Sequence, residues 1–146
     1  MIRRVVAVDP GKATGIAWMD LGRSTWSTET VEDWREVPYR VKFWGPDQIH
    51  VEEFRINAST ASKTAAPWSL KLYGALEVLA HELDIPFTHA PSTVKTIVTD
   101  RHLRAAGLWK GRSAHERDAL RHLVVALAKM NDPWAVEVLL AKEEDA

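Results

Sequence analysis

The sequence has no cysteine, no internal repeat and no long apolar run. The absence of cysteine excludes disulfides and thiolate metal sites. The first residues, MIRRVVAVDPG, reach charged and turn residues too soon for a signal peptide or a membrane span, so we expect a cytoplasmic protein with no membrane partner. A length of 146 residues with a hydrophobic fraction of 46% suits one domain over residues 1–146.

The sequence also lacks the excess positive charge that is typical of DNA-binding proteins, since its formal net charge is −1. The charge is unevenly distributed, because basic residues dominate positions 95–121 and the last residues, KEEDA, are acidic. The basic residues of this stretch are Lys95, Arg101, Arg104, Lys110, Arg112, Arg117 and Arg121. Such a stretch is typical of a nucleic-acid enzyme, and a plain solvated surface is the alternative.

The most informative segment reads VVAVDPGKATG over residues 5–15. Its four consecutive apolar residues predict a strand buried on both faces that ends at Asp9, before a turn at Pro10 and Gly11. A carboxylate in that position needs a partner, and Lys12 alone cannot neutralise it from a flexible loop. A metal ion or a cationic group is therefore expected, with an ordinary turn as the alternative.

A second short strand, in the segment IHVEEF at residues 49–54, ends in two adjacent carboxylates. Successive strand side chains point to opposite faces, so only one of Glu52 and Glu53 can face the same side as Asp9. We choose Glu52, although the periodicity is compatible with either residue. Glu53 is then solvent-facing or paired with an arginine.

The third element is a long helix that opens with SAHERDAL at Ser113. Ser113 and Glu116 form a capping box, which predicts a structural role for this glutamate. His115, Asp118 and His122 lie on the polar side of the helix, and the first two could share one ligand; a solvated face is the alternative. The apolar stripe on the other side consists of Leu120, Leu123, Val124 and Leu127.

The order strand-Asp, strand-Glu and helix-His-x-x-Asp resembles the RuvC-type Holliday-junction resolvases of the RNase H-like superfamily. The resemblance rests on D-P-G at residues 9–11 with Thr14-Gly15 after it, V-E-E-F at 51–54, H-x-x-D-A-L at 115–120 and the segment PSTVK at 91–95. It implies an α/β, RNase H-like fold whose mixed five-stranded sheet carries helices on both faces.

By this resemblance the metal ligands are Asp9, Glu52, His115 and Asp118, and Lys95 lies near the scissile phosphate. Some members of the family carry a carboxylate at the position of His115. Phosphodiester hydrolysis needs an activated water and a stabilised leaving oxygen, which two divalent ions per active site can supply. Carboxylates suit Mg²⁺, and an imidazole is also acceptable to Mn²⁺.

The resemblance implies branched DNA, especially four-way junctions, as the partner. Matched nicks on two strands favour a two-fold homodimer. The resemblance alone implies that the helix expected at residues 68–83 forms its interface. Trp68 and Trp109 are candidates for stacking on or wedging an opened base. The expected DNA contacts are Lys12, Phe54, Arg55, Lys63, Arg101, Arg104, Lys110 and Arg112.

Three other functions remain open at the level of the sequence. A related RNase H-like nuclease acting on RNA, flaps or other branched DNA would share the metal site. Sugar-kinase and actin-like ATPases also begin with a strand, an aspartate and a glycine turn, but they need a second glycine-rich phosphate loop and a longer chain. A non-catalytic junction-binding module is the third alternative.

Local patterns predict the positions of the elements. Strands are expected at 3–9, 14–19, 25–30, 48–53 and 85–90, and helices at 68–83, 92–106 and from 113 onward. Pro38 limits residues 31–44 to a short or broken helix. Residues 57–66 are expected to form a mobile loop beside the site.

Overall fold

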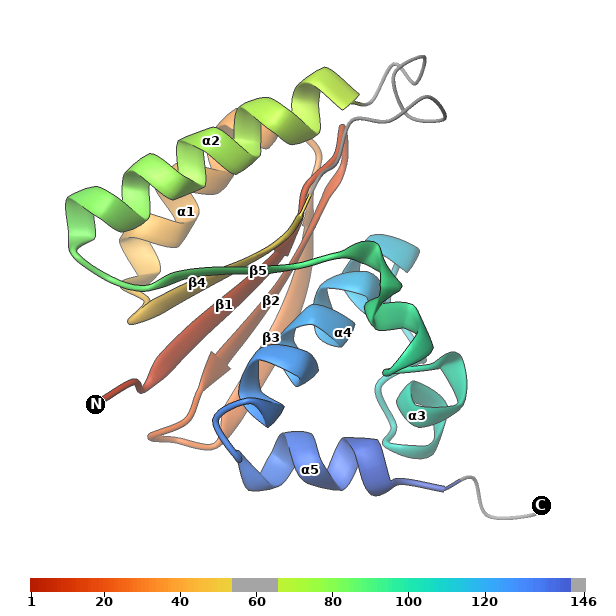
Figure 1. Ribbon diagram of the computed structural model, residues 1–146. Helices are drawn as coiled ribbons and strands as arrows, with labels where there is room; N and C mark the ends of the chain where they lie inside the picture. Colours follow the sequence, from red (N-terminus) through yellow and green to blue (C-terminus); the bar gives the residue numbers. More distant parts are fainter. Residues whose placement is uncertain (54–65, 143–146) are drawn as a thin grey trace.

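The computed structural model describes residues 1–53 and 66–142 and contains a mixed five-stranded sheet in the order β3-β2-β1-β4-β5 (Figure 1). Strand β1 pairs antiparallel with β2 and parallel with β4; β2 pairs antiparallel with β3, and β4 parallel with β5. The strands are β1 (Arg4–Asp9), β2 (Thr14–Asp20), β3 (Thr25–Val31), β4 (Gln48–Glu52) and β5 (Phe87–Ala90). The mixed sheet expected from the sequence is confirmed.

Helices cover both faces of the sheet, as expected. Helices α1 and α2 lie on one face, and α3, α4 and α5 lie on the other (Figure 1). The helices are α1 (Val37–Trp44), α2 (Ala66–Leu83), α3 (Asp100–Ala105), α4 (Ala114–Ala128) and α5 (Pro133–Leu140), with 3-10 helices at Trp34–Glu36 and Ser92–Thr96. No helix among the described residues combines the length and the apolar character that crossing a membrane requires.

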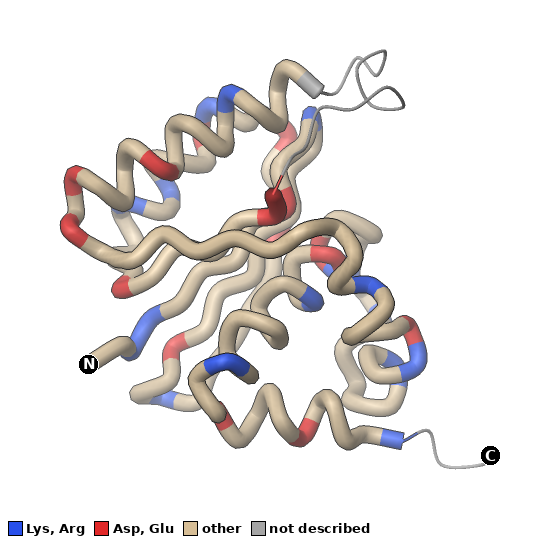
Figure 2. Tube along the Cα trace, in the orientation of Figure 1, with Lys and Arg blue, Asp and Glu red and all other residues tan. Residues whose placement is uncertain are grey.

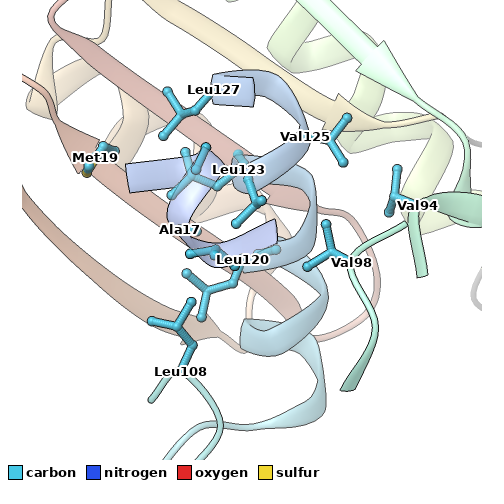
Figure 3. Packing of buried hydrophobic residues seen from close by; sticks show 14 of the residues in the cluster. Ala17, Met19, Val94, Val98, Leu108, Leu120, Leu123, Val125 and Leu127 are labelled. Atoms are coloured by element: carbon cyan, nitrogen blue, oxygen red, sulfur yellow. The ribbon is translucent and has the colours of Figure 1, made fainter. Parts of the chain in front are cut away.

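The central strand β1 is buried on both faces because side chains alternate between two cores. Val6 and Val8 pack toward α1 and α2, whereas Val5 and Ala7 pack toward α4. All four are fully buried, which explains the unbroken apolar run. Figure 3 shows how side chains of α4 fill the second core together with residues of β2, the 3-10 helix and the loop before α4.

Several boundaries differ from the expected ones. The expected helix at 92–106 is wrong, because the side chain of Thr99 caps a new helix in a capping box with His102. Strand β5 begins only after Pro86, which has no N–H for the ladder. Helix α5 was not expected. The expected loop at 57–66 falls mostly outside the described residues, and its last residue, Ala66, begins α2.

Helix α4 approaches the sheet at Gly15, which pairs with Asp9 across β1 and β2. A Cβ atom at Gly15 would overlap the backbone carbonyl of His115. Only glycine therefore lets the first turn of α4 lie against the sheet here. This contact brings the start of α4 to the end of β1, where the candidate site lies.

Candidate active site

A cleft of about 520 Å³ opens where β1 and β4 end beside the start of α4. It is lined by Asp9, Pro10, Gly11, Lys12, Ala13, Glu32, Glu52, Ser69, Lys95, His115 and Asp118. The five residues expected from the sequence to be catalytic all line this cleft, although they come from β1, β4, the 3-10 helix after β5 and α4.

Asp9 and Glu52 lie on the same face of the sheet, the face covered by α4. The alternation of β4 places Ile49 and Val51 in the core under α2, so Glu52 points the other way. Glu53 lies beyond the end of β4, and its carboxylate is 3.5 Å from Nδ1 of His89. The structure thus separates the two neighbouring glutamates.

Histidine and lysine side chains approach the carboxylates of the cleft. His115 Nδ1 lies 3.8 Å from Oδ2 of Asp9, and Lys95 Nζ lies 3.3 Å from Oδ2 of Asp118. The Asp9 and Asp118 side chains are only 13% and 20% exposed, whereas Lys95 and His115 are about half exposed. The lysine and histidine side chains at the mouth of the cleft are therefore more accessible than the carboxylates inside it.

Asp118 is held by a buried arginine that sequence reasoning counted only as part of the basic stretch. The Nη1 of Arg121 donates to Oδ1 of Asp118 at 2.8 Å, and its Nε donates to the carbonyl of Val98 at 2.9 Å. Arg121 also pairs with Asp100. Its spacing of three residues from Asp118 on one helix is the signal that could have identified it.

Glu52 contacts His122, which the sequence placed on a polar and solvated side of the helix. The structure contradicts that placement, because His122 is 1% exposed and its Nε2 lies 3.3 Å from Oε2 of Glu52. The reason is that this side of α4 faces β4, so His122 is buried together with the rest of residues 119–127. The hydrophobic periodicity of one helix cannot reveal that its polar side also packs against another element.

A second buried histidine lies beneath this contact. The rings of His50 and His122 are 5.6 Å apart, and Nδ1 of His50 lies 2.8 Å from the hydroxyl of Thr88. Burial, together with the nearby His122, lowers the pKa of His50 to about 3, so the imidazole is neutral at physiological pH. A neutral imidazole thus lies beside the histidine that contacts Glu52.

The carboxylates strongly perturb one another. Burial raises the pKa of Asp9 to about 9, helped by a hydrogen bond to Glu52 and by the charges of Glu52 and Asp118, while Lys95 acts in the opposite direction. Burial also raises the pKa of Glu52, but hydrogen bonds from His122 and Asp9 outweigh it and lower the pKa overall. The metal-free pair therefore holds one shared proton at neutral pH.

The donor set of the cleft fits divalent cations. Among residues 1–53 and 66–142, no three Asp, Glu or His side chains are already arranged around one point as metal ligands. The cleft nevertheless gathers the carboxyl groups of Asp9, Glu52 and Asp118 beside the imidazole of His115. Oxygen donors from Asp9, Glu52 and Asp118 suit Mg²⁺, and the imidazole of His115 adds a nitrogen suited to Mn²⁺.

Five of the expected DNA-binding residues lie in the described part of the chain, in three places. Lys12 lines the cleft, Arg101 and Arg104 lie on α3, and Lys110 and Arg112 lie in the loop before α4. Basic residues follow the segment from the 3-10 helix through α3, on the α4 side of the sheet (Figure 2). The remaining three, Phe54, Arg55 and Lys63, lie outside the described residues.

The two candidate aromatic residues occupy different surroundings. Trp68 lies in the first turn of α2 and is 37% exposed. The centroid of its ring lies 6.1 Å from that of Trp34. Trp109 is half-buried and has arginine groups over its ring. Sequence reasoning missed Ser69, whose Oγ donates to the carbonyl of Pro10 at 3.0 Å, because no local pattern connects α2 with the end of β1.

No family model and no curated protein matches this sequence. Solved structures do share its fold. The RuvC of T. thermophilus in complex with a Holliday junction substrate aligns with a TM-score of 0.64 and 20% identity, covering 88% of this chain and 96% of that chain. Another structure of Thermus thermophilus RuvC gives a TM-score of 0.59 with the same identity and coverage.

A eukaryotic protein has the same architecture. Ydc2, the yeast mitochondrial Holliday junction resolvase, aligns with a TM-score of 0.51 and 15% identity, covering 94% of this chain and 80% of that chain. The α/β architecture with a mixed five-stranded sheet, expected from the resemblance to RuvC-type proteins, is therefore confirmed, and the fold of this chain is similar to that of RuvC-type resolvases.

Proposed function

We propose that this protein is a metal-dependent, structure-selective DNA endonuclease that resolves four-way junctions by paired nicks. The observation that carries the proposal is the gathering of Asp9, Glu52 and Asp118 in one cleft, with His115 and Lys95 at its mouth. The similar fold of a RuvC in complex with a Holliday junction substrate supports the choice of substrate.

The residues of the cleft take distinct roles in this proposal. Asp9, Glu52 and Asp118, with His115, would hold two Mg²⁺ or Mn²⁺ ions, which would supply an activated water and stabilise the leaving oxygen. The ammonium of Lys95, half exposed beside Asp118, stabilises charge that develops on the attacked phosphate. Arg121 and His122, which contact Asp118 and Glu52, are buried and keep these two carboxylates in orientation.

Paired nicks on a nearly two-fold substrate require two equivalent sites, which a homodimer provides. We assign the interface to α2. Its inner side packs against the sheet through Leu72, Leu76 and Leu79, while Leu70 and Val78 remain 39% and 58% exposed on the outside. Contact of these side chains with a second copy of the chain would remove them from water.

The proposal is tested by incubating the protein with labelled four-way, three-way, flap and linear DNA, and with RNA–DNA hybrids, in Mg²⁺ or Mn²⁺. Symmetric nicks in the four-way junction are expected, and Asp9→Asn should bind the junction but not cleave it, because an amide is a poor metal ligand of similar shape. Preferential cleavage of RNA or flaps would contradict the junction assignment. Equal loss of binding and cleavage in Asp9→Asn would contradict the catalytic role.

A further inference from the structure

Helix α3, helix α4 and the loop between them each contribute one arginine to a group that does not line the active-site cleft. The guanidinium carbons of Arg104 and Arg117 lie 4.3 and 4.0 Å from the ring centroid of Trp109. Beside them, the guanidinium of Arg112 lies 4.6 Å from the ring of Trp26. We call Arg104, Trp109, Arg112 and Arg117 the Trp109 cluster.

The loop is built to hold the Trp109 ring in place. Helix α3 ends at Ala105, and Gly107 then adopts a φ of 74°, the left-handed conformation that favours glycine; the N–H of Leu108 closes the turn onto the carbonyl of Leu103. Leu108 is 2% exposed and points into the core beside Leu120 (Figure 3). The next residue, Trp109, also packs at the edge of this core.

The cationic groups of the cluster have no acidic partner within the described part of the chain. None of the ion pairs between described residues includes Arg104, Arg112 or Arg117. Their donated hydrogen bonds go to backbone carbonyls, from Arg117 to Arg112 and from Arg112 to Lys110. The acids that flank Arg117 in sequence have other partners: Glu116 bonds Thr28, Thr30 and Ser113, and Asp118 pairs with Lys95 and Arg121.

The arginines of the Trp109 cluster differ from Arg121, which also lies on the α4 side of the sheet. Arg121 is buried and neutralised by Asp118 and Asp100, as expected of a structural arginine. In the Trp109 cluster, each guanidinium instead lies over an aromatic ring, with its carbon 4.0 to 4.6 Å from the ring centroid, and has no carboxylate partner among the described residues. Stacking lowers the conformational entropy that an arginine loses on binding, so the cluster is pre-organised for an anion.

We propose that the Trp109 cluster is a second phosphate-binding site that grips the sugar–phosphate backbone of a DNA arm next to the cleft. Arg117 directly precedes Asp118 on α4, so the cluster and the candidate active site share the first turns of one helix. The inference rests on the proposed nuclease function. It adds that arm binding depends on an uncharged residue, Trp109, through the two arginines it orients.

Each phosphate contact contributes about −0.9 to the slope of log affinity against log salt concentration. One contact therefore makes the affinity about eightfold higher at ~0.1 M salt than at ~1 M salt. Arg104→Ala and Arg117→Ala should each flatten the slope by about one unit. Trp109→Leu removes no charge, yet it should weaken binding at least as much as either arginine variant. Trp109→Phe keeps a ring and should retain most of the affinity.

The measurement is fluorescence anisotropy with labelled duplex and four-way junction DNA in EDTA over a salt series, so that no cleavage occurs. Arg40→Ala is the matched control, because it removes the same charge from α1 on the opposite face, where Arg40 pairs with Glu29 and Glu36. It should leave the slope unchanged. Thermal unfolding of each variant checks the fold, and Arg104 is exposed, so its variant tests the site even if Trp109→Leu is unstable.

Salt slopes of Arg104→Ala and Arg117→Ala equal to that of Arg40→Ala would overturn the second site. A folded Trp109→Leu protein that binds DNA like the parent would overturn the orienting role of the ring. Both results are distinguishable from failure of the proposed function, which would appear as absent junction cleavage by the unmodified protein in Mg²⁺ and Mn²⁺. Unchanged slopes together with normal junction cleavage would remove this site alone.

Discussion

Binding of a divalent ion to the cleft should release about one proton. In the metal-free protein the raised pKa of Asp9 keeps a proton on the Asp9–Glu52 pair at neutral pH. Because a carboxylate must be ionised to bind Mg²⁺ or Mn²⁺, the incoming ion has to displace that proton. The cost of this displacement falls as the pH rises toward the pKa of Asp9.

The size of the pH effect on metal affinity follows from the release of one proton for each ion bound. Apparent affinity should rise about tenfold per pH unit as long as the pH stays below the pKa of Asp9, which is equivalent to about 1.4 kcal/mol per unit. Isothermal titration calorimetry at two or three pH values, in buffers with different ionisation enthalpies, counts the released proton directly. Asp9→Asn should bind the ion more weakly and without this proton release.

The effect of the Asp9 pKa on folding stability has the opposite sign from that of most carboxylates in proteins. A carboxyl whose folded pKa is raised costs stability above its ordinary pKa, because the unfolded state releases the proton more readily. Metal-free Asp9→Asn should therefore unfold at a higher temperature than the parent at neutral pH, and the difference should shrink in acid. Metal affinity that does not change between pH ~6 and ~8, or Asp9→Asn with the parent's proton release, would refute this reasoning.

Two further predictions concern the contacts that position the cleft. Gly15→Ala should destabilise the protein strongly and reduce cleavage, because the added Cβ meets the His115 carbonyl. A melting temperature and a cleavage activity within error of the parent would show that α4 can shift without cost. His122→Phe fills the buried space but leaves Glu52 without its hydrogen bond, so metal affinity measured by calorimetry should fall about 10–100-fold in a protein that still folds. Parental affinity would leave His122 with a packing role only.

Much of the fold could be predicted because its strongest signals are local. The apolar run before Asp9 identifies a strand buried on both faces, and Ser113 with Glu116 identifies the start of α4. The capping box forms as expected, with Ser113 and Glu116 each bonded to the other's backbone N–H. Helices on both sides of the sheet follow from the same buried run.

The remainder depends on which elements pack together, and a single element does not encode that. The periodicity of α4 identifies one apolar stripe, but His122 is buried because another part of the fold covers its side of the helix. The break at Thr99 and the contact of Ser69 with Pro10 likewise arise from capping and from tertiary packing. Asp9, Glu52 and Asp118 come together for the same reason, through the sheet register and the close approach of α4 at Gly15.

The central claim is that metal ions held on the α4 side of the sheet carry out cleavage, and the adjacent pair Glu52 and Glu53 tests it most directly. The two variants Glu52→Gln and Glu53→Gln remove the same charge at neighbouring positions, but only Glu52 lines the cleft with Asp9. Cleavage of a labelled four-way junction in Mn²⁺, measured alongside calorimetric metal binding, should be abolished with much weaker metal binding in Glu52→Gln and close to parental in Glu53→Gln. An active Glu52→Gln beside an inactive Glu53→Gln would contradict the account.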